Sequence, residues 1–174
     1  MLRVALTGPE STGKSTLSRL LAEHYRTAWA PEYARQYLEE RGPNYTLPDL
    51  EEIARGQLRH EAAAAAEARR LDRPIVFFDT DLLVIQIWAE HAFGHCPAWI
   101  AQHVQQHRYD LTLLLHVDLP WEPDPLREHP HQREYFFRLY QQRLQALGAP
   151  VNEISGPPPQ RLAQAVAAVG EVIG

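Results

Sequence analysis

The most constraining stretch of this sequence is the loop Gly-Pro-Glu-Ser-Thr-Gly-Lys-Ser at positions 8–15, which joins two segments of different periodicity. Before it, residues 2–7 are apolar and β-branched, as is typical of a buried strand. After it, apolar side chains recur at helical spacing between residues 15 and 25. A strand that runs through a glycine-rich loop into a helix predicts a fold built on a mainly parallel sheet.

Apolar runs and helical spacing continue to alternate along the rest of the chain. Further strands are expected at 27–30, 75–78, 111–117 and 151–154, and helices at 33–41, 48–71, 82–93, 97–107, 134–147 and 159–173. This pattern predicts an α/β, three-layer fold in which helices flank a mainly parallel sheet of about five strands. A chain of 174 residues is expected to form one domain, residues 1–174, with ligands beyond the carboxyl ends of the strands.

Composition excludes several classes of protein. The 17 Lys+Arg against 22 Asp+Glu give a net charge of −5, opposite in sign to the field that nucleic acid or an anionic membrane requires. The single cysteine, Cys96, cannot form an internal disulfide, and the chain opens on a strand without a signal-peptide pattern. Its apolar runs are far shorter than the ~20 residues of a membrane span. We therefore expect a cytoplasmic protein with a small-molecule substrate, and neither nucleic acid nor membrane as a partner.

The loop at 8–15 satisfies the pattern G-x-x-x-x-G-K-[ST] in the strand-to-helix context that the pattern requires. Its backbone N–H groups and the helix N-terminus attract phosphate oxygens, and Lys14, the only lysine of the chain, is a compact charge that can reach between phosphates. The Ser15 hydroxyl is placed to ligate Mg²⁺, so ATP and Mg²⁺ are the expected cofactors. The alternative is a glycine-rich turn that only caps a helix. The loop residues expected at the nucleotide are Gly8, Glu10, Ser11, Thr12, Gly13, Lys14 and Ser15.

An acidic motif follows the apolar run at 75–78. Asp79 ends this run as the acid of a Walker B strand does, and would hold Mg²⁺ directly or through water. Alternatively, this stretch caps the following helix through Thr80 or Asp81, because Asp and Thr are preferred at that position. The two interpretations are compatible.

The stretch Pro31-Glu32-Tyr33-Ala34-Arg35 follows the second expected strand, where an acceptor would bind. Glu32 could accept the proton of a hydroxyl, Arg35 could hold a phosphate or another polar group, and Tyr33 offers a ring face. Alternatively, Glu32 and Arg35 form a surface pair at the start of a helix.

A polar, proline-rich segment at about 118–133 contains Arg127 and Arg133. These arginines could close over the phosphates as a lid that neutralises charge and excludes water. Alternatively, the segment is a solvated loop.

Several histidines raise the question of a transition metal. His103 and His107 have i, i+4 spacing and His95-Cys96 lies nearby, but neither H-E-x-x-H nor paired-cysteine spacing is present. Surface or helix-capping roles are expected for them. The loop at 155–158 is expected to contact adenine, because it borders the phosphate site in such sheets.

Together these motifs resemble the nicotinamide riboside kinase domain of NadR-type proteins, a family of P-loop NTPases. The matching stretches, in the same order and at similar spacing, are TGPESTGKSTL at 7–17, PEYARQYL at 31–38, FFDTDLL at 77–83, YDLTLLL at 109–115 and W-x-x-D-x-L-R at 121–127. The resemblance covers nearly the whole chain. It implies ATP-dependent phosphorylation of the 5′-hydroxyl of nicotinamide riboside, giving nicotinamide mononucleotide for NAD salvage.

The resemblance also implies roles, position by position. Residues 8–16, which add Thr16 to the loop, bind the triphosphate, and Asp79 and Asp81 serve metal and ribose. The residues implied at the acceptor site are Glu32, Tyr33 and Arg35, and those implied in the lid are Arg127 and Arg133. The carboxylates that could take the proton are Glu32, Asp79 and Asp81, and with Lys14 and the two lid arginines they form the expected catalytic set.

This sequence departs from the family in two ways. NadR-type proteins usually carry an N-terminal adenylyltransferase domain, whereas this sequence begins at the kinase strand. A stand-alone kinase domain is therefore expected, without adenylyl transfer or repression. The aromatics that sandwich the pyridinium ring in the family are replaced by Pro31 and Ala63. Side chains that could supply another face, or simply pack in the core, are Trp88, Tyr33, Trp29 and Trp121. The alternatives are a kinase for another nucleoside or nucleotide, and a regulatory ATP-binding module with little turnover.

Overall fold

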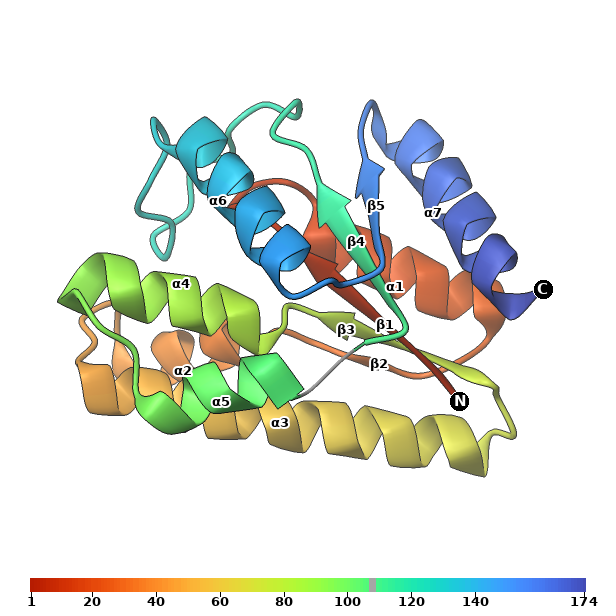
Figure 1. Ribbon diagram of the computed structural model, residues 1–174, viewed down its shortest axis with the longest axis horizontal. Coiled ribbons are helices and arrows are strands. Elements are labelled where there is room, and N and C mark those ends of the chain that lie inside the picture. Colours follow the sequence, from red (N-terminus) through yellow and green to blue (C-terminus); the bar gives the residue numbers. More distant parts are fainter. Residues whose placement is uncertain (107–108) are drawn as a thin grey trace.

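A computed structural model describes residues 1–106 and 109–174. Its sheet contains β1 (Leu2–Thr7), β2 (Trp29–Ala30), β3 (Ile75–Asp79), β4 (Leu111–Leu115) and β5 (Val151–Ile154). Within these described ranges the strand order is β2-β3-β1-β4-β5, and every pairing is parallel (Figure 1). The predicted parallel α/β sheet is therefore confirmed.

The central strands are buried on both faces, which explains their continuous apolar runs. All five residues of β3 and of β4 are buried, as expected where helices cover both sides of a parallel sheet. Leu6 of β1 pairs with Asp79 of β3, and Ala30 of β2 pairs with Phe78. The carboxyl ends of β1, β2 and β3 therefore meet at one edge of the sheet.

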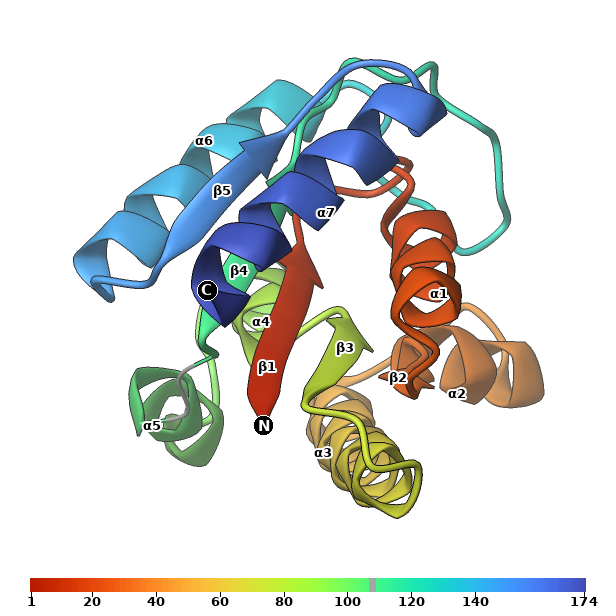
Figure 2. The same ribbon diagram turned by 90° about the vertical axis from the view of Figure 1, so that its right-hand side faces the viewer.

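Helices cover both faces of the sheet and give three layers (Figure 2). One face is covered by α1 (Lys14–Tyr25) and α7 (Pro158–Ile173), whose apolar side chains pack on β1, β3, β4 and β5. The helices on the other face are α2 (Tyr33–Arg41), α3 (Leu47–Arg70), α4 (Leu82–Phe93), α5 (Ala98–Gln106) and α6 (Arg133–Ala146). The three-layer prediction is confirmed.

Element boundaries agree with the sequence expectations to within a few residues. The long helix α3 begins after Thr46, whose side chain accepts from the Asp49 N–H while the Asp49 carboxylate accepts from the Thr46 N–H, an arrangement that fixes a helix start. The strand expected at 111–117 ends earlier, at Leu115. The helix expected to reach His107 is described only to Gln106, and His107 itself lies outside the described residues. None of the helices in the described ranges is both long and apolar enough to cross a membrane.

Candidate active site

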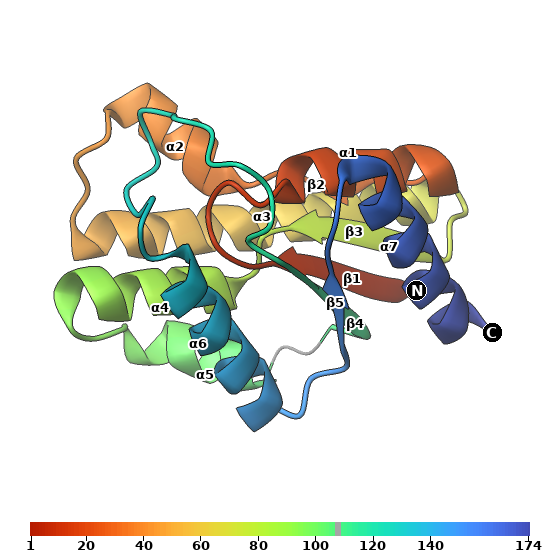
Figure 3. The same cartoon turned by 90° about the horizontal axis from the view of Figure 1, so that it is seen from above.

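The loop at 8–13 wraps around the N-terminus of α1 (Figure 3). Gly8 has φ +133°, and a Cβ there would lie 3.0 Å from the carbonyl oxygen of Leu115, so a larger residue does not fit. Gly13 caps α1 in the left-handed region, with φ +82°. The Lys14 ammonium donates to the carbonyls of Gly8 at 2.9 Å and Pro9 at 2.7 Å. Burial lowers the pKa of this amine, and the nearby acids Glu32, Asp79 and Glu10 oppose the shift.

A cavity of about 550 Å³ opens in front of this loop, between α1, α2, α4, α6 and the segment that follows β4. Its size is that of a typical small-molecule site. The structure brings most of the predicted site residues together on its wall. These are Gly8, Glu10, Ser11, Thr12, Gly13, Lys14, Ser15, Thr16, Glu32, Arg35, Trp88, Arg127 and Arg133.

Two carboxylates stand beside the Lys14 amine. Glu32 occupies the N-cap position of α2, and burial together with the nearby Asp79 raises its pKa to about 7. Asp79 ends β3 and is 1% exposed; burial also raises its pKa. The Ser15 hydroxyl and the Glu32 backbone N–H lie near enough to the Asp79 carboxylate to favour its ionised form, so they oppose this rise of its pKa. A cation, a hydroxyl and two acids with raised pKa values thus converge where β1, β2 and β3 end.

The segment between β4 and α6, residues 116–132, crosses over the loop and reaches toward α2 (Figure 3). The Glu10 carboxylate accepts from the backbone N–H groups of Glu128 and His129, each at 3.1 Å. The Ser11 hydroxyl accepts from the Glu122 N–H at 2.9 Å. Glu10, predicted at the nucleotide, is therefore also the residue that attaches this segment to the loop.

Both arginines of this region point to the loop. The Arg133 guanidinium donates to the Ser11 carbonyl at 3.2 Å, and that of Arg127 donates to the Ser11 hydroxyl at 3.4 Å. Arg35 of α2 donates to Asp124 of the crossing segment at 3.1 Å. Arg35 thus pairs with Asp124 of the crossing segment and with Glu39 of its own helix. Among the described residues it forms no ion pair with Glu32, which the surface-pair alternative had supposed.

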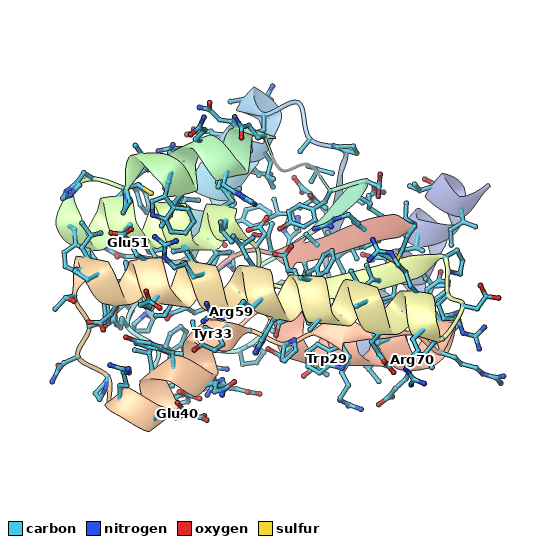
Figure 4. All side chains as sticks on the ribbon, turned by 90° about the horizontal axis from the view of Figure 1, so that it is seen from below. Trp29, Tyr33, Glu40, Glu51, Arg59 and Arg70 are labelled. Atoms are coloured by element: carbon cyan, nitrogen blue, oxygen red, sulfur yellow. The ribbon has the colours of Figure 1, made fainter. Side chains whose placement is uncertain are left out.

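Four predicted site residues do not line the cavity: Asp79, described above, and Tyr33, Asp81 and Trp121. Tyr33 packs against α3, with its ring 5.8 Å from the Arg59 guanidinium and its ring centroid 5.0 Å from that of His60; Figure 4 shows Tyr33 and Arg59 together at the α2–α3 contact. Asp81 is 3% exposed and caps α4, because its Oδ1 accepts from the Val84 N–H at 3.2 Å. Burial raises the pKa of Asp81 to about 6. The capping interpretation therefore holds for Asp81. Neither Tyr33 nor Asp81 lies on the cavity wall.

The remaining aromatic candidates differ in where they lie, and the histidines form no metal site among the described residues. Trp29 packs with the core under α1, and Trp121 lies 5.7 Å below the Arg133 guanidinium, outside the cavity wall. Trp88 lines the cavity. His103 lies within the residues that the structure describes, whereas His107 lies outside them. Across residues 1–106 and 109–174, no group of three or more His, Cys, Asp or Glu is arranged to hold a metal ion.

Several wall residues were missed by reasoning from the sequence. On α6, Phe136 and Tyr140 follow Arg133 at positions i+3 and i+7 and so share its face; this spacing was visible in the sequence. Tyr45 precedes α3 and donates to the Glu128 carboxylate at 2.8 Å, while it accepts from the Trp88 indole at 2.7 Å. No local motif marks Tyr45.

One residue of the loop at 155–158, which is expected to contact adenine, lines the cavity. Pro158 lines the cavity, and the Gly156 N–H donates to Asp118. Arg161, 3% exposed, donates to the carbonyls of Thr12 at 2.7 Å and Gly156 at 2.7 Å. Arg161 therefore joins this loop to the phosphate loop, a role that the sequence did not reveal.

Comparisons with known proteins agree with this geometry. Curated relatives include the trifunctional NAD biosynthesis/regulator protein NadR of Salmonella typhimurium and that of Escherichia coli, each 32% identical over 130 residues, or 71% of this chain and 30% of the relative. This chain therefore spans less than a third of the length of these relatives.

Solved structures give the same grouping. A crystal structure of a NadR protein in complex with NR superimposes with a TM-score of 0.80 at 25% identity, over 99% of this chain and 51% of that one. A thymidylate kinase from Ehrlichia chaffeensis, with a TM-score of 0.65 at 16% identity over 99% and 98% of the two chains, shares the fold. The sequence profile described as an AAA domain matches residues 3–161, which is most of the chain, and the chain therefore belongs to the AAA domain family.

Proposed function

We propose that this chain is an ATP-dependent kinase that phosphorylates the 5′-hydroxyl of nicotinamide riboside and yields nicotinamide mononucleotide in NAD salvage. The observation that carries the proposal is the convergence of the Lys14 amine with the Glu32 and Asp79 carboxylates. Lys14 and Glu32 line the cavity, and Asp79 is buried beside them at the end of β3. Phosphoryl transfer depends mainly on alignment and charge neutralisation, and this arrangement supplies both. The likeness to a NadR protein in complex with NR supports the choice of acceptor.

The loop at 8–16 would hold the triphosphate. The Lys14 ammonium now donates to two backbone carbonyls of its own loop. Phosphate oxygens are charged acceptors and form stronger hydrogen bonds than carbonyls do. A bound triphosphate would therefore take over these bonds, with the loop N–H groups and the N-terminus of α1 around it.

The end of β3 suits Mg²⁺. The Oδ1 atom of Asp79 is buried and has no hydrogen-bond partner among the described residues, and the Ser15 hydroxyl lies against the same carboxylate. Hard oxygen ligands of this kind are those that Mg²⁺ prefers. We assign Ser15 and Asp79 to the metal, which when bound neutralises charge on the phosphates.

Glu32 is the carboxylate best placed to take the proton of the acceptor hydroxyl. Asp79 is assigned to the metal and Asp81 to the cap of α4. A general base works best with a pKa near the working pH, and the pKa of Glu32 is raised to about 7. Glu32 would hold the hydroxyl, receive its proton and so align the attacking oxygen.

The acceptor ring would lie against the aromatic wall formed by Trp88, Tyr45 and Phe136. Of the four aromatic candidates only Trp88 is on the wall described for the cavity, and its indole is fixed by the hydroxyl of Tyr45. Pro31 and Ala63, which replace the family aromatics, are both exposed. A cationic ring is attracted by the face of tryptophan and by a carboxylate nearby, and Glu128 supplies that charge.

The segment at 118–133 would act as the lid of this single domain. It bonds to the phosphate loop through Glu10 and Ser11 and to α2 through Asp124. Closure over the phosphates would exclude water that otherwise hydrolyses ATP.

A screen for ADP release tests the function. Purified protein with Mg·ATP is supplied with nicotinamide riboside, uridine, cytidine, adenosine or thymidine. ADP release that depends on nicotinamide riboside supports the proposal. If only another nucleoside is phosphorylated, the chain is a kinase for that nucleoside instead. If no acceptor is phosphorylated, a regulatory ATP-binding module explains the fold and the cavity better.

Glu32→Gln is expected to lower kcat by about 10²- to 10⁴-fold, because the amide cannot accept the proton.

The change Glu32→Gln should also stabilise the metal-free protein. The folded state binds a proton at Glu32 that the unfolded state has released between pH 4.5 and 7, so this carboxylate costs stability as pH rises through that window. The variant should therefore exceed the wild type by about 1–3 kcal/mol in unfolding free energy above that window.

Denaturant unfolding in EDTA measures this difference. Below pH 4.5 the two proteins should have nearly equal unfolding free energies, because both groups are then neutral. A constant difference at every pH would contradict the raised pKa.

A further inference from the structure

Gln57 of α3 lies where two catalytic segments meet. The first segment leaves β2 and carries Glu32; the second ends β3 with Asp79 and Thr80. The two strands pair directly, with Ala30 opposite Phe78. Gln57 is 1% exposed and lies outside the cavity wall, so the proposed reaction does not use it directly.

The Gln57 carboxamide bonds to both segments at once. Its Oε1 accepts from the Tyr33 backbone N–H at 2.9 Å. Its Nε2 donates to the carbonyl of Asp79 at 3.3 Å and to that of Thr80 at 3.2 Å. A single planar group therefore sets the distance between the residue after Glu32 and the backbone of Asp79.

Two of the three partners of Gln57, Thr80 and Tyr33, are held in demanding positions. Thr80 is a β-branched residue with φ +75°, a conformation that persists only where surrounding contacts over-determine it. The Tyr33 ring occupies the space of a side chain at Gly56: a Cβ there would lie 1.9 Å from Cε1 of Tyr33. The Tyr33 ring packs on Gly56 and the Tyr33 N–H donates to Gln57, the next residue of α3. These two contacts fix the backbone next to Glu32.

We propose that Gln57 is a positioning residue that sets the separation of the Glu32 and Asp79 carboxylates through these three hydrogen bonds. The proposal rests on the kinase activity proposed above. A misplacement of about 1 Å at a reacting group can cost 10²-fold in rate. Loss of the carboxamide should therefore lower kcat and leave the phosphate loop, and with it ATP binding, intact.

The test compares Gln57→Met, which keeps the length and burial of the side chain but removes its polar atoms, with Gln86→Met on α4. Gln86 is partly buried and, among the described residues, donates only to Glu90, at 2.9 Å, so it is a matched control outside the site. We expect Gln57→Met to lower kcat between about 10- and 100-fold, with KM for ATP within about twofold. The control should keep the wild-type kcat.

Gln57→Glu provides a second variant of the same shape. It keeps the oxygen that accepts from Tyr33, and its carboxyl group, protonated in this buried position, donates to only one of the two carbonyls. Its kcat should therefore fall between those of Gln57→Met and the wild type. Should Gln57→Met fail to fold, a fall in kcat for Gln57→Glu still supports the proposal. A kcat within about threefold of wild type in the folded variants, or an equal fall in the control, overturns it.

A crystal structure of a Gln57 variant separates this proposal from the proposed function. If the wild type turns over no acceptor, the kinase assignment fails, but the geometry can still be measured. A change of about 1 Å in the separation of the Glu32 and Asp79 carboxylates supports positioning by Gln57, and an unchanged separation refutes it.

Discussion

Replacing Lys14 with methionine is expected to lower kcat/KM for ATP by about 10³-fold, because a preorganised charge in a site that excludes water is worth several kcal/mol to the transition state. Lys14 is the only lysine of the chain, and its ammonium is already held at the loop by the Gly8 and Pro9 carbonyls. Methionine keeps most of the length of the side chain. Steady-state kinetics with Mg·ATP and nicotinamide riboside measure the loss.

Two further variants show that the loss belongs to this charge. Lys14→Arg keeps the positive charge but introduces a broad planar group, and we expect it to remain at least about 10²-fold below wild type. Arg19→Met on the exposed side of α1 removes a cation that pairs with Glu23 and should leave kinetics unchanged. Activity of Lys14→Met near that of wild type would contradict the proposed phosphate site.

The double variant Arg127→Ala with Arg133→Ala should lose about 10³-fold in kcat, the scale seen when an arginine that faces the transferred phosphate is removed. Both guanidinium groups contact Ser11 of the loop and line the cavity. Binding of AMP-PNP in the absence of acceptor should change much less, because the backbone N–H groups and Lys14 remain.

The control for this pair is Arg138→Ala, an exposed arginine on the same helix α6, which should behave as wild type. Isothermal titration measures AMP-PNP binding, and product formation measures transfer. Equal losses in binding and in kcat would show that the arginines only hold nucleotide. Unchanged transfer by the double variant would favour the regulatory module over the kinase.

Local patterns in the sequence predicted most of the fold and the strand-to-helix loop that lines the cavity. The loop at 8–15 lies between a strand and a helix, and β3 and β4 are uninterrupted apolar runs because they are buried on both faces. Asp79 follows from the same logic, since it is the last residue of a buried strand at the ligand edge. Each of these signals needs only neighbouring residues.

The acceptor side depends on contacts between distant segments, which no local pattern encodes. In the sequence, Tyr33 could equally be a ring that faces the substrate. Gly56, which lies 23 positions further along the chain, leaves a space on α3 that the Tyr33 ring fills. Asp81 matches an active-site acid and a helix cap equally well in sequence, and the Val84 N–H decides for the cap. Gln57 in an alanine-rich helix carries no sequence signal at all.

The crossing segment is fastened on two sides of the cavity. Glu10 and Ser11 hold it over the loop at 8–15. Arg35 and Tyr45 hold it on the opposite side of the cavity, through Asp124 and Glu128. These attachments belong to one short stretch of backbone, so they would break and re-form in concert. Departure of ADP and of the phosphorylated nucleoside would then share a single opening event.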